Sequence, residues 1–206
     1  MKNASKHAPG RRQGFTLVEI VVVVAIMALL IAFSGSMFAP GLNAQKLAIT
    51  ARTLTGDLKQ AALHAAKEGR PVEVRFYRYV PTDAPGGEFF RAYQLAMLTG
   101  FGDNSQPQYR LLGEVKRFPP GIVLAPMAEY TTLESLPIRE KTEDDPDFVP
   151  DYSISAYQIN PTGSTTLPRS PAPVLTIVEE RFAGEKLPAN YWSITIDPDN
   201  SHAQIY

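Results

Sequence analysis

One carboxylate near the start of the chain interrupts a stretch that is otherwise apolar. Glu19 follows Leu17 and Val18, and it precedes an unbroken apolar run over residues 20–33. A charged side chain costs about 2.5 kcal/mol or more near the centre of a bilayer and somewhat less close to the interface. Such residues usually have a partner and a function. Glu19 is therefore the first candidate for a residue with a specific chemical role.

The segment before this stretch, residues 1–14, contains four cations and no acid: Lys2, Lys6, Arg11 and Arg12. The positive-inside bias favours holding such a segment in the cytoplasm while the apolar residues enter the bilayer. The 14 residues of the unbroken run are short for a spanning helix, which needs about 20. Counted from Phe15 to Phe33, the stretch reaches 19 residues, or about 28 Å, which is close to the hydrocarbon thickness.

Residues 14–19 read Gly-Phe-Thr-Leu-Val-Glu, so six successive positions carry defined residue types. Together with the basic leader and the apolar stretch, they resemble the class III signal of type IV prepilins and type II secretion pseudopilins. The resemblance implies cleavage after Gly14 by a membrane prepilin peptidase and N-methylation of the new amino terminus on Phe15. It also implies that Glu19, fifth in the mature chain, meets the amino terminus of a neighbouring subunit and sets axial register during filament assembly.

Two other interpretations of the same stretch remain open. An ordinary secretory signal peptide would be cleaved at a small-residue site near Ala32-Phe33-Ser34, and a plain single-pass anchor would not be cleaved there. A conventional signal peptide gains nothing from a carboxylate at Glu19, which favours the prepilin interpretation. Under either alternative, the rest of the chain would be a membrane-anchored or secreted periplasmic binding domain outside any filament.

The next elements expected are a transmembrane or filament-core helix over 15–36 and an amphipathic continuation over 37–70. Pro40 predicts a bend or local unwinding within residues 34–41. Gly69 and Pro71 end the second part in the expected order. Apolar residues spaced four and three apart form one stripe, which we expect to pack under a sheet: Leu47, Ala51, Leu54, Leu58, Ala61 and Ala65.

From residue 71 to residue 206 the pattern predicts a soluble β-sheet domain. Val72, Val74 and Phe76 alternate with polar or aromatic neighbours, and a second run around 93–97 follows the turn at 85–87. Further short strands are predicted near 109–112, 115–118, 122–124, 153–159, 174–179, 191–196 and 203–206. Strands after one long helix indicate an α+β fold with a mainly antiparallel sheet. An insertion occupies residues 129–152.

The soluble part narrows the resemblance. Residues 58–76, a helix end followed at once by a strand, resemble the GspH/FimT group of minor pseudopilins. Residues 118–122, the turn at 159–164 and the terminal hairpin around 197–200 are similar to that group too, although such turns occur in many β proteins. The insertion 129–152 argues against a major pilin. Length and layout are also similar to Verru_Chthon cassette D proteins, a prepilin-type family of unknown function.

The remaining residues offer little chemistry. The histidines His7, His64 and His202 show no metal-ligand spacing, and an acidic run over 140–151 contains two prolines and lacks the order of a calcium loop, so a solvated loop is expected. Glu179 and Glu180 are expected to form an exposed charge cluster. No nucleophile elbow, metalloprotease helix or phosphate loop is present in the sequence. We therefore predict no catalytic residue, metal, cofactor or small-molecule substrate.

Charge argues against nucleic acid as a partner. Without the leader, the chain carries 16 basic and 21 acidic side chains, whereas non-specific DNA binding depends on Lys and Arg neutralising phosphates. A basic patch on one sheet face, built from Arg70, Arg75, Arg78 and Arg91, would reverse that expectation. The sequence thus predicts a minor pseudopilin-like subunit of a type II secretion or type IV pilus-like filament. It would cross the bacterial inner membrane once, with a periplasmic C-terminal domain and other pilins or pseudopilins as partners.

Overall fold

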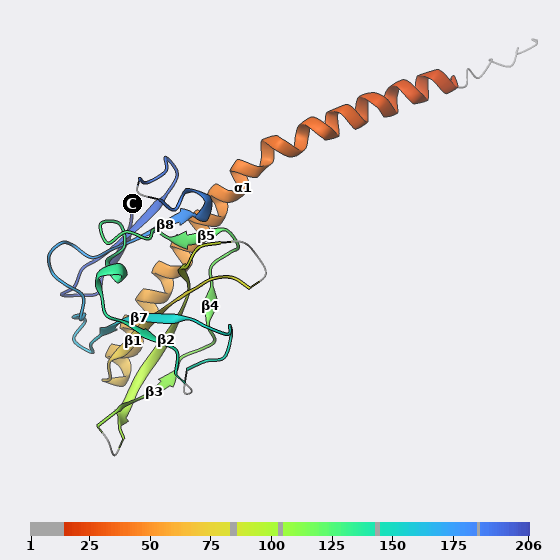
Figure 1. The fold of residues 1–206 in the computed structure, drawn as a ribbon. Coiled ribbons are helices and arrows are strands. Elements are labelled where there is room, and N and C mark those ends of the chain that lie inside the picture. Colours follow the sequence, from red (N-terminus) through yellow and green to blue (C-terminus); the bar gives the residue numbers. More distant parts are fainter. Residues whose placement is uncertain (1–14, 83–85, 103–104, 143–144, 185) are drawn as a thin grey trace, which may run out of the picture. The chain divides into compact units, whose positions relative to one another are not determined.

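The computed structural model describes residues 15–82, 86–102, 105–142, 145–184 and 186–206, with only the backbone described over 32–41. The first element is a single helix, α1, Leu17–Glu68, of 52 residues (Figure 1). The backbone is helical through Pro40, so the local unwinding predicted there is wrong. Proline removes one hydrogen bond and crowds one carbonyl, and a long helix can continue past both.

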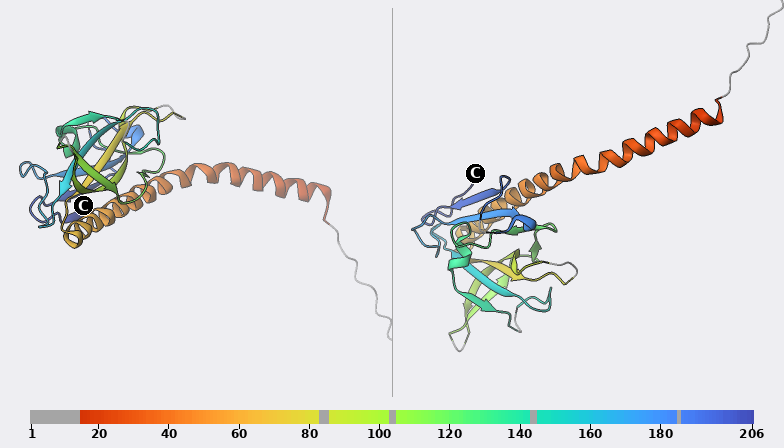
Figure 2. Two further views of the ribbon diagram at one scale, coloured as in Figure 1. Left: turned by 90° about the horizontal axis from the view of Figure 1, so that it is seen from below. Right: turned by 45° about the horizontal axis from the view of Figure 1, so that its top comes forward.

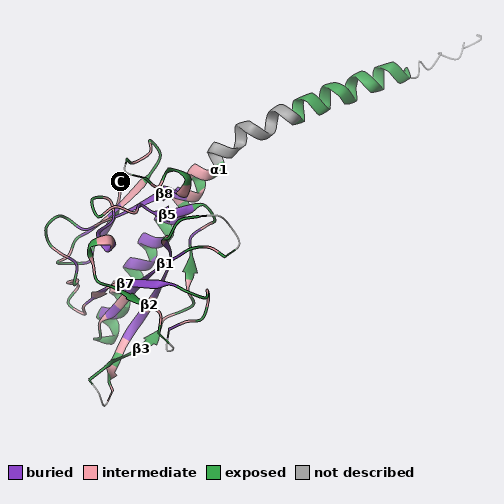
Figure 3. Cartoon of the chain, in the orientation of Figure 1, coloured by how far each residue is buried: buried purple, intermediate pink, exposed green. Residues whose placement is uncertain are grey.

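The chain divides into two compact units, residues 1–42 and 43–206. In the second unit, residues 43–68 of α1 turn their predicted stripe towards the strands, and all six stripe residues are at most 1% exposed (Figure 3). Gly69, with φ +63°, ends the helix, and the amide of Arg70 bonds to the carbonyl of Ala65. This is a Schellman C-cap, which needs a residue that tolerates positive φ.

The larger sheet contains β1 (Val72–Tyr79), β2 (Phe89–Phe101), β3 (Pro107–Leu111), β4 (Lys116–Arg117), β6 (Ile138–Glu140) and β7 (Ser153–Ile159). Its order is β3-β2-β1-β7-β6, and β4 also pairs with β2. Every pairing is antiparallel, with Val74 opposite Leu95 on β2 and Tyr157 on β7. The predicted hairpin is thus the centre of this sheet.

The smaller sheet has the order β10-β9-β8-β5, again antiparallel throughout. Its members are β5 (Ile122–Leu124), β8 (Val174–Glu179), β9 (Trp192–Ile196) and β10 (Ala203–Ile205). The described residues also form two short 3-10 helices outside the sheets, η1 (Thr132–Ser135) and η2 (Glu180–Phe182). The predicted α+β class, with a helix packed on antiparallel strands, is confirmed. Figure 2 shows the second half of α1 lying along the strands from two further sides.

Both faces of the larger sheet are covered. Val72, Val74 and Phe76 on β1 join the helix stripe in one apolar cluster. On the opposite face, Tyr77 lies in a second cluster with Tyr152 from the insertion, and Phe148 packs against it. The Tyr77 ring meets the rings of Phe148 and Tyr152 edge-on, with centroids 5.0 and 5.2 Å away. Residues 148–152 at the end of the insertion therefore pack on this face of the sheet, whereas β6 from the same insertion is a strand of the sheet itself.

Candidate functional site

The N-terminal end of α1 is closed by two residues of the predicted signal. The Thr16 amide donates to Glu19 Oε2 at 3.2 Å, and the Glu19 amide donates to Thr16 Oγ1 at 3.2 Å. The Thr16 hydroxyl also donates to Glu19 Oε2 at 3.2 Å. This reciprocal arrangement is a capping box, in which two amides that the helix leaves unbonded receive acceptors from side chains.

The capping box gives Glu19 a partner inside its own chain. A carboxylate in the first turn is also stabilised by the positive end of the helix dipole. Sequence reasoning identified Glu19 but missed Thr16, although Thr-x-x-Glu before an apolar run is the signature of this cap. Both bonds to the Glu19 side chain end on Oε2. An ionised carboxylate offers about four acceptor sites on two oxygens, so this side chain can accept further donors.

The predicted cleavage site lies directly before this cap. Phe15 is outside the helix, and it is 82% exposed. Gly14 and the leader 1–14 lie outside the described residues. The described residue on the C-terminal side of the predicted Gly14–Phe15 cleavage site is thus non-helical and exposed.

Every residue from Phe15 to Ile31 is exposed, including the valines and isoleucines of the apolar stretch. Soluble monomers rarely expose contiguous apolar surface beyond a few hundred Å². Among the described residues, no helical stretch combines the length and apolar character that crossing a membrane requires. The described side chains of the predicted 15–36 helix stop at Ile31, and the rest of that range lies outside them.

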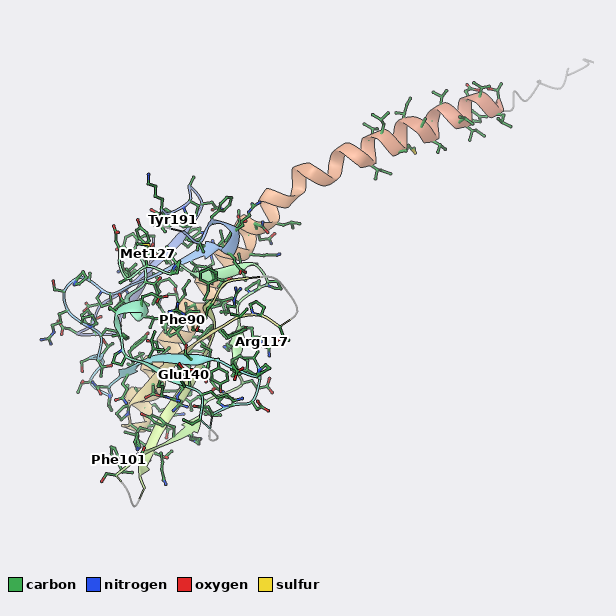
Figure 4. All side chains as sticks on the ribbon, viewed as in Figure 1. Phe90, Phe101, Arg117, Met127, Glu140 and Tyr191 are labelled. Atoms are coloured by element: carbon green, nitrogen blue, oxygen red, sulfur yellow. The ribbon has the colours of Figure 1, made fainter. Side chains whose placement is uncertain are left out.

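The acidic run differs from the solvated loop that was expected, because Asp145 is buried. Arg139 donates to its two oxygens at 2.5 and 2.8 Å, and Thr142 donates through its amide at 3.0 Å and its hydroxyl at 2.9 Å. Burial alone would raise the pKa of Asp145, but these hydrogen bonds outweigh it and lower the pKa to about 2. Figure 4 shows the side chains here, with Glu140 at the end of β6 labelled.

Other acids in this region behave differently. Asp147 is exposed and pairs with Lys141 at 2.7 Å, as a solvated loop would allow. Within the described residues, no three His, Asp or Glu side chains are grouped so that they could hold a metal ion. His64 and His202 are exposed and far apart in the sequence, and His7 lies outside the described residues.

The expectation of an exposed cluster at Glu179 and Glu180 is wrong. Glu179 is buried and accepts hydrogen bonds from Asn43 at 2.9 Å and Arg181 at 2.8 Å. Glu180 forms a two-point pair with Arg91, and hydrogen bonds from this guanidinium lower the pKa of the carboxyl. Asn43 and Arg91 come from α1 and β2, so the sequence neighbourhood of the glutamates does not reveal them.

The four arginines that could have formed a basic patch do not form one. Arg75 and Arg91 are buried and pair with Glu73 and Glu180. Arg78 is half-buried and pairs with Glu134 at 2.9 Å. Arg70 is exposed at the end of the helix. Three of the four arginines are thus paired with carboxylates, and the geometry offers no open basic sheet face made from them.

Comparisons with known proteins address the N-terminal segment and the fold separately. Residues 9–35 match the family model described as the prokaryotic N-terminal methylation motif. No curated protein matches the sequence. Among solved structures, the minor pseudopilin EpsH from the type 2 secretion system of Vibrio cholerae is similar, with 12% identity, 78% of this chain and 96% of that chain covered, and a TM-score of 0.42. The chain therefore carries a prepilin-type methylation motif, which implies processing by a prepilin peptidase.

Proposed function

We propose that this protein is a minor pseudopilin-like subunit of a type II secretion or type IV pilus-like filament. It is cleaved between Gly14 and Phe15, methylated on Phe15 and held in the inner membrane by residues 15–36. From there it enters a short periplasmic filament. The observation that carries the proposal is the methylation motif at 9–35. Within it a capped helix begins, and every described residue from Phe15 to Ile31 is exposed.

The capping box supports a specific role for Glu19 in this pathway. Cleavage would leave an ammonium group on Phe15, one residue before the cap, and the positive end of a helix disfavours a cation there. The Glu19 carboxylate offsets that charge while it caps the helix. Its remaining acceptor sites can take the ammonium group of a neighbouring subunit. Glu19 would then cap its own helix and also set the axial register with the next subunit.

The exposed apolar surface supports a two-stage environment for the helix. Lipid covers such side chains before assembly, and the helices of other subunits cover them in a filament core. Association between helices in lipid depends on packing and hydrogen bonds, since lipid is as apolar as the side chains. The domain of residues 43–206 then supplies the surface that distinguishes this subunit, and residues 148–152 of the insertion cover one face of its larger sheet.

The test is intact mass and N-terminal sequencing of the full chain isolated from membranes of its own host. We expect a chain that begins at methylated Phe15. A Gly14→Leu variant should keep its leader, and Glu19→Ala should be processed but fail to co-purify with other pilin-type subunits. A parent chain that begins near Gly35 would replace this proposal with a secreted periplasmic domain. If the parent chain keeps its leader, the interpretation that remains is a plain membrane anchor.

A further inference from the structure

The outward side of α1 in the second unit carries cations without carboxylate partners. Arg52, Lys59 and Lys67 are exposed and lie within about 80° of one another around the helix at 100° per residue. No ion pair joins any of them to a carboxylate among the described residues. The acids of this helix half point elsewhere, since Asp57 is buried against Lys116 and Glu68 lies about 120° from Gly56.

An apolar line runs beside Arg52 and Lys59 on the same side of the helix. Ile49 and Leu63 are 53% and 67% exposed, and Gly56 lies midway between them at seven-residue spacing. Residues seven apart share one face because seven is close to two helical turns. We define the outward face as Ile49, Arg52, Gly56, Lys59 and Leu63.

Nothing in the described part of the fold requires glycine at position 56. A Cβ added to it meets no atom within 4 Å, and its φ is not positive. Glycine inside a helix costs about 1 kcal/mol relative to alanine, and no contact in this domain offsets that cost. The glycine leaves a notch in the helix surface next to Arg52 and Lys59, about 10 Å along the axis from each of Ile49 and Leu63. Such a notch lets the backbone or a ridge of another helix approach closely.

The chemistry of the outward face selects its occupant. A second copy would bring the same cations against Arg52 and Lys59, and this like-charge contact opposes pairing. A membrane surface would gain nothing from the notch. We propose that the outward face binds a helix of a different polypeptide, with an apolar ridge residue in the notch at Gly56 and Asp or Glu side chains facing Arg52 and Lys59. The inference deepens the proposed function and rests on it only in taking the partner to be another filament subunit.

The first experiment places a photo-cross-linking amino acid at Gln60, which is exposed beside the notch, in the full chain in its own host. A matched probe at Gln204, exposed on β10, is the control. Cross-linked peptides are identified by mass spectrometry. We expect Gln60 to join one segment of a different protein that carries carboxylates beside apolar residues at helical spacing, and Gln204 not to join it. Cross-links to lipid, to a second copy or to nothing would each overturn the proposal.

Two sets of variants test the notch and the charges. Gly56→Leu fills the notch, whereas Ala66→Leu adds the same side chain to an exposed position at the edge of the face. Gly56→Leu should lower the cross-link yield at least tenfold without lowering the melting temperature, because leucine is the better helix former. An equal loss with Ala66→Leu, or undiminished cross-linking with Gly56→Leu, would contradict the notch.

For the charges, Arg52→Glu with Lys59→Glu should also weaken the cross-link about tenfold, and added salt should weaken it in the parent. Arg110→Glu with Lys186→Glu makes the same change in net charge at exposed positions away from the helix and should have little effect. Insensitivity to both charge reversal and salt would refute the acidic partner. The mass of each variant reports leader cleavage, so loss of docking is separable from failed processing.

Discussion

Asp145→Asn should destabilise the sheet domain at neutral pH and have much less effect in acid. Asp145 has a side chain that is 4% exposed, with Arg139 bonded to both oxygens. Its pKa is lowered from 3.8 to about 2, which corresponds to roughly 2 kcal/mol at 1.36 kcal/mol per unit. Because Arg139 is 45% exposed, solvent screens the pair, and we expect a loss of about 1 kcal/mol.

The sign of the pH dependence follows from the direction of the shift. A carboxyl with a lowered pKa in the folded state contributes fully above its unfolded pKa, here 3.8, and the contribution is lost as pH falls through about 2. The stability difference between the parent and Asp145→Asn should therefore narrow between pH 4 and pH 2.

Urea unfolding of the full chain in detergent measures this difference, with the fluorescence of the single tryptophan, Trp192, as the signal. Asp147→Asn is the matched control, because its side chain is 88% exposed and its pairing with Lys141 is open to water. The control should be indistinguishable from the parent. Equal losses in the two variants, or a difference that stays constant down to pH 2, would refute the reasoning.

Three further predictions concern α1. Leu54→Ala should lower the unfolding free energy by about 2–5 kcal/mol in the same urea assay, because Leu54 is fully buried, whereas Leu63→Ala on the exposed side should change it by less than about 0.5 kcal/mol. Gly69→Ala should lower the melting temperature through a loss of about 1 kcal/mol, because the C-cap holds φ at +63°; an unchanged melting temperature would contradict the cap. Glu19→Gln keeps an acceptor for the Thr16 amide but removes the charge, so it should preserve hydrogen-exchange protection of the first turn and lose co-purification with other subunits. Retained co-purification would show that the charge is not needed for assembly.

Local patterns in the sequence predicted much of the fold. The stripe from Leu47 to Ala65 and the alternation at Val72, Val74 and Phe76 place apolar residues with periods of about 3.6 and 2, and these periods follow from helix and strand geometry. Turn residues delimited most of the other strands. Strand β6 was not predicted, because Ile138–Glu140 is too short and polar to show alternation.

Long-range pairs were the part that the sequence did not reveal. Glu179 bonds to Asn43, 136 residues away, and Arg91 bonds to Glu180, 89 residues away. Asp145 has its partners nearby at Arg139 and Thr142, but its burial depends on the sheet beneath the insertion. Of the candidate site, Glu19 was identified from its charge in an apolar stretch. The capping role of Thr16 could have been predicted from the Thr-x-x-Glu pattern before the apolar run, but it was missed.

The hydrogen bond from Asn43 to Glu179 lies where a load applied along α1 would first reach the second unit. Asn43 is the first residue of this unit, and Glu179 is the last residue of strand β8. A tension applied along α1 would load this hydrogen bond first. The buried stripe from Leu47 to Ala65 would then resist sliding of the helix along the strands, because all of its contacts would be loaded at the same time. The contacts between the stripe and the strands would thus transfer the force to the sheet before it reaches the turn at Gly69. If the second unit is pulled by its helix, it should therefore resist in shear, which spreads the load over the buried length of residues 43–68.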